Sequence, residues 1–217
     1  MAQFTHIIFD LDGTLTDNTQ GIINSLKHSL EKLHIYDYPE NLLDGFIGPP
    51  LQWGFSQLFG LNERDTKLAV EYFREYYGEN GWHQNVPYDG VLEMIAELDR
   101  LGKKMFIATS KLEKFAVQIM EYFELDKYII QLKGADYHAK KATKTQLISD
   151  ILTTHQLVPS KEIAMVGDTV YDIEGGKENK LSTVAVFYGF GKVEELKNAS
   201  PDFFADDVEE LFEILAG

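Results

Sequence analysis

The sequence predicts an α/β protein in which a Rossmann-like parallel sheet carries helices on both faces and an all-α subdomain is inserted. From residue 88 onward, short apolar runs alternate with segments whose apolar residues recur at helical spacing. This order implies a parallel sheet with right-handed crossovers. Residues 40–87 show no clear strand pattern, and a chain of 217 residues can hold a core domain with an inserted smaller one.

The first strand is predicted at Phe4–Phe9, an apolar run near the N-terminus. A helix should follow, because Leu26 and Leu30 belong to an apolar series at helical spacing, with Asp17 or Asn18 as its N-cap. Two further helical patterns lie between residues 51 and 77, the first with Trp53 and Phe55 in the core of the inserted subdomain.

The later elements alternate regularly. They are predicted at 91–98 (helix), 105–108 (strand), 112–123 (helix), 128–132 (strand), 144–155 (helix), 163–166 (strand), 171–179 (helix), 183–187 (strand), 203–204 (short strand) and 208–215 (helix). We therefore expect residues 1–14 and 88–217 to form the α/β core and residues 15–87 to form a helical cap.

Composition limits the classes of function. The net charge of −15 would repel long phosphate polymers, so no nucleic-acid partner is expected. The chain has no cysteine and no apolar run near 18 residues, which excludes disulfides and argues against a membrane partner. The N-terminus does not resemble a secretory signal, and we expect a cytoplasmic protein, either a monomer or a homodimer.

Pairs of aspartates follow two of the predicted strands. Asp10 and Asp12 follow the first strand, and Asp168 and Asp172 follow the strand at 163–166. Residues i and i+2 of an extended segment point to the same side, so Asp10 and Asp12 are expected to face one site. In open α/β sheets this carboxyl edge is where ligands bind.

Converging carboxylates need a counter-charge. Two carboxylates ~4 Å apart repel by roughly 4 kcal/mol at an effective dielectric constant of about 20. A divalent cation removes this repulsion, and Mg²⁺ suits a site of two carboxylates, a carbonyl, waters and a phosphate. The alternative is that each aspartate merely caps a helix or forms an Asx-turn.

The segments FDLDGTLTD, IATSK, a later lysine and GDTVYD follow one another in an order that resembles the haloacid dehalogenase-like hydrolase superfamily. The resemblance covers the chain and implies that Asp10 is the nucleophile and a metal ligand. It implies that Asp12 is the general acid and then the base, with its backbone carbonyl on the metal. Dehalogenating members and ion-pumping ATPases lack an aspartate in that place, so Asp12 favours a phosphatase or a phosphomutase.

The same resemblance assigns the other site residues. Thr109 would bind the phosphoryl group, with Ser110 as a secondary candidate and Gly13 permitting the close backbone turn beside the phosphate. Asp168 would ligate the metal, and Asp172 would hold a metal-bound water or brace the site lysine.

The identity of that lysine stays open among several candidates. Lys144, which precedes an apolar pair at the opening of a helix, fits best, while Lys140 and Lys141 are alternatives and Lys133 is a more distant one. Lys111, next to Ser110, is expected to be a surface residue.

The turn formed by Gly48, Pro49 and Pro50 is the most distinctive part of the inserted segment and could face the substrate. Similar turns occur in phosphoglycolate phosphatase-like and 5'-nucleotidase-like relatives. The sequence therefore predicts a Mg²⁺-dependent phosphatase that hydrolyses a small phosphorylated metabolite through an aspartyl-phosphate, with phosphoglycolate or a nucleoside 5'-monophosphate as substrate. Alternatives are a phosphomutase of the same superfamily, and a phospho-aspartate signalling or non-catalytic binding module.

Overall fold

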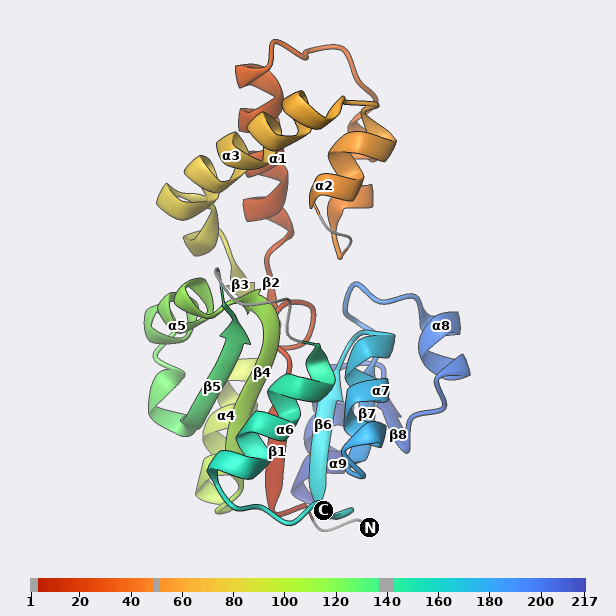
Figure 1. The fold of residues 1–217 in the computed structure, drawn as a ribbon. Coiled ribbons are helices and arrows are strands. Elements are labelled where there is room, and N and C mark those ends of the chain that lie inside the picture. Colours follow the sequence, from red (N-terminus) through yellow and green to blue (C-terminus); the bar gives the residue numbers. More distant parts are fainter. Residues whose placement is uncertain (1–3, 49–50, 137–142) are drawn as a thin grey trace. The chain divides into compact units, whose positions relative to one another are not determined.

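A computed structural model describes residues 4–48, 51–136 and 143–217, and the chain divides into two compact units (Figure 1). Unit 1 consists of Met1–Asp17 and Pro87–Gly217, and unit 2 is Asn18–Val86. The chain passes from one unit to the other at two short paired strands, β2 (Thr16–Asp17) and β3 (Val86–Pro87). The sequence pattern did not predict these strands, because two residues are too few to show a periodicity.

Unit 1 is built on a six-stranded parallel sheet in the order β5-β4-β1-β6-β7-β8. The strands are β1 (His6–Phe9), β4 (Lys104–Leu112), β5 (Ile129–Ala135), β6 (Ile163–Gly167), β7 (Ser182–Val186) and β8 (Phe203–Ala205). This topology confirms the predicted fold class. Strand β4 is longer than the predicted run at 105–108, because it continues past a register shift against β5 that lies between Ala108 and Leu112.

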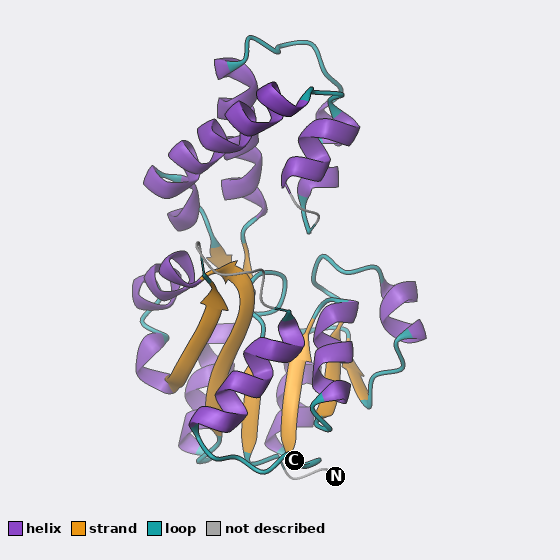
Figure 2. Ribbon diagram, viewed as in Figure 1, coloured by secondary structure: helices purple, strands orange, loops and turns teal. Residues whose placement is uncertain are grey.

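Helices cover both faces of this sheet (Figure 2). Helices α6 and α7 lie in front of it in Figure 1, and α4 and α9 lie behind it. The helices of unit 1 are α4 (Val91–Arg100), α5 (Glu113–Tyr122), α6 (Lys144–Thr154), α7 (Val170–Glu178), α8 (Val193–Asn198) and α9 (Val208–Ala216). Helix α8 was not predicted, since its six residues are too few to show helical periodicity.

The core explains why the central strands are apolar on both faces. Ile8, Phe106 and Met165 come from three neighbouring strands and pack with Ile148 and Ile151 of α6 in one buried cluster. The next residues along these strands, Phe9, Ile107 and Val166, are also fully buried, as expected for a parallel sheet that is covered on both faces. The sheet is therefore a rigid support for the loops at its carboxyl edge.

Unit 2 is helical. It contains α1 (Thr19–Lys32), α2 (Leu51–Trp53), a π-helical turn (Gly54–Leu58) and α3 (Glu63–Glu79). Asn18, not Asp17, occupies the N-cap position of α1. Phe55 is fully buried, as predicted, but the prediction for Trp53 is wrong because this residue is 46% exposed.

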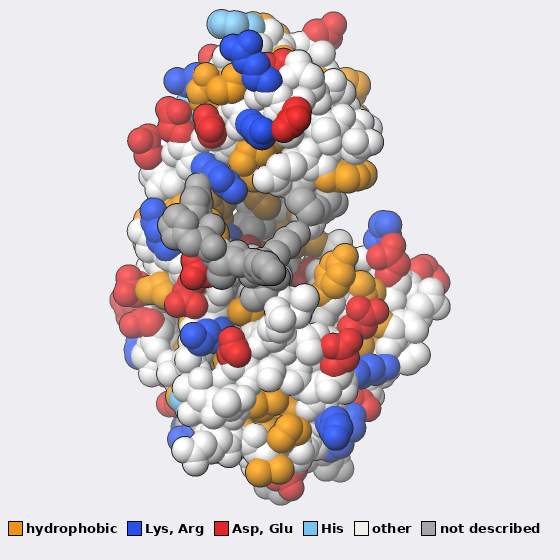
Figure 3. All heavy atoms as spheres, in the orientation of Figure 1, with side chains coloured by type: hydrophobic (Ala, Val, Ile, Leu, Met, Phe, Trp, Pro, Cys, Tyr) orange, Lys and Arg blue, Asp and Glu red, His pale blue; other side chains and the backbone are white. Residues whose placement is uncertain are grey.

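On the face shown in Figure 3, acidic and basic side chains are interspersed. Within the described ranges, none of the helices is both long and apolar enough to span a membrane.

Candidate active site

Asp10 lies where β1 ends, at the centre of the sheet between β4 and β6. Its backbone N–H donates to the carbonyl of Val166, 2.9 Å away, which continues the β1–β6 ladder by one residue. The side chain is only 11% exposed, and its Oδ1 lies 2.8 Å from Nζ of Lys144. The sheet itself thus holds this carboxylate in place beside a cation.

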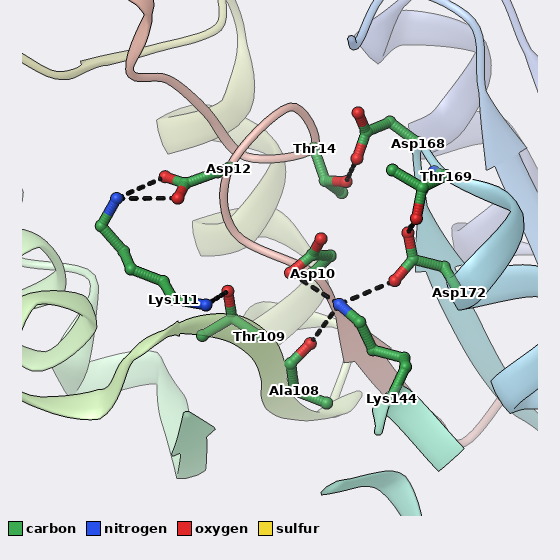
Figure 4. Close-up of polar contacts among 10 residues, drawn as sticks. All are labelled: Asp10, Asp12, Thr14, Ala108, Thr109, Lys111, Lys144, Asp168, Thr169 and Asp172. Carbon is green, nitrogen blue, oxygen red and sulfur yellow. Dashed lines mark hydrogen bonds and ion pairs between the residues drawn. The ribbon is translucent and has the colours of Figure 1, made fainter. Parts of the chain in front are cut away.

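Lys144 is the first residue of α6, and a capping box between Thr143 and Gln146 fixes that helix end. Its ammonium contacts Oδ1 of Asp10 at 2.8 Å and Oδ1 of Asp172 at 2.7 Å, and donates to the carbonyl of Ala108 at 2.9 Å (Figure 4). Of the lysines that the sequence left open, Lys144 therefore lies in the site. Lys133 is part of β5, and Lys140 and Lys141 fall outside the described residues.

Asp10, Asp168 and Asp172 form a buried acidic cluster. Each offers a carboxylate oxygen, and the three oxygens lie within 4.8 Å of one another. Burial raises the pKa of Asp10, the nearby Lys144 lowers it, and repulsion from Asp172 raises it again. The net result is a pKa of about 6. Burial and repulsion from Asp10 and Asp172 raise the pKa of Asp168 to about 7. Burial alone would lower the pKa of Lys144, but the neighbouring carboxylates Asp10 and Asp172 outweigh it and raise that pKa.

Asp168 is held by two hydrogen bonds, one to each carboxylate oxygen. Its Oδ1 accepts a hydrogen bond from Thr14 Oγ1 at 3.3 Å, and its Oδ2 accepts one from the Phe190 N–H at 2.9 Å. Gly13 has a φ of +82°, and a Cβ there would lie 2.3 Å from Asp168 Oδ2. The DGT turn can therefore approach this carboxylate only because residue 13 is glycine.

Asp172 is the third residue of α7, and its Oδ2 caps that helix. It accepts hydrogen bonds from the backbone N–H of Thr169 at 3.0 Å and from the Thr169 hydroxyl at 2.7 Å. The other oxygen meets Lys144. Asp172 thus joins the start of α7 to the start of α6.

Asp12 faces a different cation. Its two carboxylate oxygens lie 2.9 and 2.7 Å from Nζ of Lys111, whose side chain is only 6% exposed. The prediction that Lys111 is a surface residue is therefore wrong. A signal was present, because Thr109 and Lys111 stand two residues apart at the end of β4, as Asp10 and Asp12 do after β1.

Thr109 lies at this strand end and is 1% exposed. Its hydroxyl accepts a hydrogen bond from the backbone N–H of Lys111 at 3.2 Å, whereas Ser110 is exposed. Figure 4 shows Thr109 beside Asp10, with Asp12 and Lys111 on one side and Lys144 on the other.

The loop after β7 also belongs to the site, and its residues were not predicted from the sequence. Tyr188 donates from its hydroxyl to the carbonyl of Thr14 at 2.9 Å, and Phe190 holds Asp168. A Cβ on Gly189 would lie 2.2 Å from the carbonyl oxygen of Gly13, so the loop needs glycine there. The alternating glycines of YGFG were the only local signal of this close approach.

The predicted cap turn lies elsewhere in the chain. Gly48 is part of unit 2 and has a φ of +99°, while Pro49 and Pro50 fall outside the described residues.

The acidic cluster fits a metal ion. Of the three buried carboxylates, Asp10 and Asp172 contact the same lysine, Lys144. The pKa values of Asp10 and Asp168 are raised because these groups are buried and lie close to other carboxylates. A cation with several oxygen ligands would remove that repulsion. Asp10, Asp168 and Asp172 could therefore hold a divalent ion.

The fold and the site define an α/β protein with an acidic active site at the carboxyl edge of its sheet. More particularly, residues 7–186 match the family described as haloacid dehalogenase-like hydrolase, and the chain belongs to this family. The predicted superfamily is thereby confirmed.

Individual relatives have several functions. A 5'-nucleotidase from Pseudomonas aeruginosa is 33% identical over 98% of this chain and 96% of its own length. The tyrosine-protein kinase PtkA from Mycobacterium tuberculosis is 30% identical over 96% of this chain and 72% of its length. A phosphoglycolate phosphatase from Vibrio parahaemolyticus is 29% identical over 97% of this chain and 95% of its own length.

Among solved structures, a protein from Clostridium difficile described as a phosphatase matches with a TM-score of 0.95 and 34% sequence identity. The match covers 99% of this chain and 100% of the Clostridium difficile chain. The family and its phosphatase-named members support the predicted enzyme class, a phosphoric monoester hydrolase.

Proposed function

We propose that this chain is a Mg²⁺-dependent phosphatase that hydrolyses a small phosphomonoester through an aspartyl-phosphate on Asp10. The observation that carries the proposal is the division of the two leading aspartates between two lysines. Asp10 contacts Lys144 in the buried cluster, whereas Asp12, two residues after Asp10 in the sequence, contacts Lys111. A nucleophile and an acid–base group need such different surroundings.

The nucleophilic atom would be Oδ2 of Asp10. The other oxygen, Oδ1, is shielded from solvent and lies against Lys144. Lys144 would offset the negative charge of both the nucleophile and the phosphoryl group, because its ammonium lies at the centre of the cluster. The Thr109 hydroxyl, the backbone at Gly13 and, less directly, Ser110 would bind the phosphoryl oxygens.

The reaction would proceed in two displacements. Oδ2 of Asp10 attacks phosphorus, the bond from phosphorus to the ester oxygen breaks, and the ester oxygen leaves with a proton from Asp12. A water molecule then attacks phosphorus, Asp12 takes a proton from that water, and inorganic phosphate separates from Asp10. Proton transfer by a placed carboxyl group typically contributes ~10²–10⁴-fold.

Asp10, Asp168 and Asp172 would hold Mg²⁺, with the backbone carbonyl of Asp12 as a further ligand. When bound, the ion supplies positive charge that stabilises the phosphoryl oxygens. Thr14 and Phe190 would keep Asp168 in position for this role, since they hydrogen-bond both of its oxygens.

Unit 2 would serve as the cap that selects the leaving group, corresponding to the predicted segment 15–87. Lids of this kind exclude water and commit the substrate. Relatives named 5'-nucleotidase and phosphoglycolate phosphatase support a small phosphorylated metabolite as the substrate.

A phosphate-release screen tests the proposal. The substrates would be 2-phosphoglycolate, nucleoside 5'-monophosphates, sugar phosphates, pyrophosphate and an aryl phosphate, each with Mg²⁺ and with excess chelator. We expect inorganic phosphate from at least one monoester, and loss of that activity on chelation. Release from none of them would contradict the proposal. Full activity in chelator would contradict the metal, and phosphorylation of an acceptor without phosphate release would point to a transferase.

A further inference from the structure

Lys111 pairs with Asp12, but the proposed reaction gives its ammonium no contact with the substrate. Its side chain is 6% exposed, and its ammonium contacts both oxygens of Asp12 at 2.9 and 2.7 Å. Lys144 already supplies the cation beside Asp10, and in the proposed reaction it would also face the phosphoryl group. The two lysines come from different elements and approach the site from opposite sides (Figure 4).

The contact with Asp12 places Lys111 on the leaving-group side of phosphorus. Asp12 must come within hydrogen-bond distance of the ester oxygen in order to protonate it. Since Nζ of Lys111 is 2.7 Å from Asp12 Oδ2, the ammonium would lie roughly two hydrogen-bond lengths from that oxygen, on the order of 6 Å. The first atoms of the leaving group therefore come next to a buried positive charge.

We propose that Lys111 binds a second anionic group of the substrate and so selects phosphomonoesters with a carboxylate close to the ester oxygen. This inference rests on the proposed function and narrows its substrate class. A carboxylate one carbon away from the ester oxygen, as in 2-phosphoglycolate, can reach an ammonium at that distance. The ester oxygen of a nucleoside 5'-monophosphate is followed by uncharged sugar carbons, which cannot form an ion pair with the Lys111 ammonium.

The ion pair between Asp12 and Lys111 supports a substrate that carries a carboxylate. Asp12 must turn one oxygen toward the ester oxygen in order to act, so at least one of its two contacts with Lys111 opens. A substrate carboxylate then replaces the lost contact with a new charge-assisted one. Hydrogen bonds to charged groups are among the stronger contacts in proteins, so the exchange can provide real discrimination.

The test compares 2-phosphoglycolate with its amide, which has the same shape without the charge. The kcat/KM ratio of the two esters is measured for the wild type, Lys111→Met and Lys111→Gln. Differences in intrinsic reactivity cancel, because each ester is its own reference across the variants. Both substitutions should lower the ratio by at least about tenfold, mostly through KM. Lys114→Met is the matched control, since Lys114 is an exposed lysine of the neighbouring α5, and it should leave the ratio unchanged.

A binding measurement separates this inference from the proposed reaction. In an Asp10→Asn background with Mg²⁺, calorimetry gives dissociation constants for both ligands without relying on turnover. Lys111→Met should weaken the binding of phosphoglycolate at least about tenfold more than the binding of its amide. Equal effects on the two ligands, or binding of neither, would overturn the inference even if the enzyme is a phosphatase. Turnover by Asp10→Asn would instead overturn the proposed nucleophile. The comparison of the two dissociation constants would still test whether Lys111 binds the carboxylate.

Discussion

Replacing Lys144 by methionine removes the cation from the acidic cluster while nearly keeping the volume of its side chain. The ammonium lies 2.8 Å from Asp10 and 2.7 Å from Asp172, and its side chain is 3% exposed. Each attraction amounts to about 6 kcal/mol at an effective dielectric constant of about 20. Much of that is offset by the cost of burying the charges, and breaking a buried pair typically costs about 3–5 kcal/mol. We expect a loss of this size in the free energy of unfolding.

The assay is urea denaturation without Mg²⁺, followed by far-ultraviolet circular dichroism. Tryptophan fluorescence is unsuitable, because Trp53 and Trp82 both lie in unit 2. Lys27→Met is the matched control, since Lys27 pairs with Glu40 on the surface and should cost no more than about 1 kcal/mol. The loss for Lys144→Met should shrink as the pH falls below about 6, where Asp10 becomes protonated. Equal losses in the two variants at neutral pH would refute the electrostatic account.

Three further predictions concern the same site. The folded-state pKa of Asp168 is raised from 3.8 to about 7, so its ionisation penalises the folded state increasingly across this range and fully above it. From about pH 5 to pH 8, metal-free wild type should therefore lose stability relative to Asp168→Asn, and parallel pH profiles in denaturation would count against this. Gly13→Ala should destabilise the protein more than Gly60→Ala, because both glycines have positive φ but only a Cβ at residue 13 would meet another residue, Asp168; equal melting temperatures would argue against the steric clash. Thr109→Val should lower kcat/KM by about one to two orders of magnitude, whereas Thr153→Val on the exposed face of α6 should not, and unchanged kinetics for Thr109→Val would remove that hydroxyl from phosphate binding.

Much of the site was predictable, because its residues follow strands in a local pattern. Asp10 comes directly after an apolar strand, and Asp168 repeats this after β6. The carboxyl ends of parallel strands meet at one edge, so convergence of the aspartates follows from the topology. Lys144 was favoured because it opens a helix and precedes the apolar pair Leu147 and Ile148, as the site lysine does in the resembling family; α6 does begin at Lys144.

The parts that were not predicted depend on long-range contacts. Lys111 was expected at the surface, because its spacing from Thr109 at the end of β4 suggests only which side it faces and does not reveal the partner that buries it. Its burial follows from the ion pair with Asp12, which is 99 residues away in the sequence. Tyr188 and Phe190 were missed for the same reason, since they hold Thr14 and Asp168 through single hydrogen bonds that no periodicity records.

The role of Asp10 as nucleophile is the central claim, and its most direct test is the rate of aryl phosphate hydrolysis by Asp10→Asn. The substitution keeps the size of the side chain but removes the charged oxygen that would attack phosphorus. We predict a loss of at least about a thousandfold in kcat, with a circular dichroism spectrum and thermal unfolding that show an intact fold. A folded Asp10→Asn variant that turns over within about tenfold of the wild type would contradict the account.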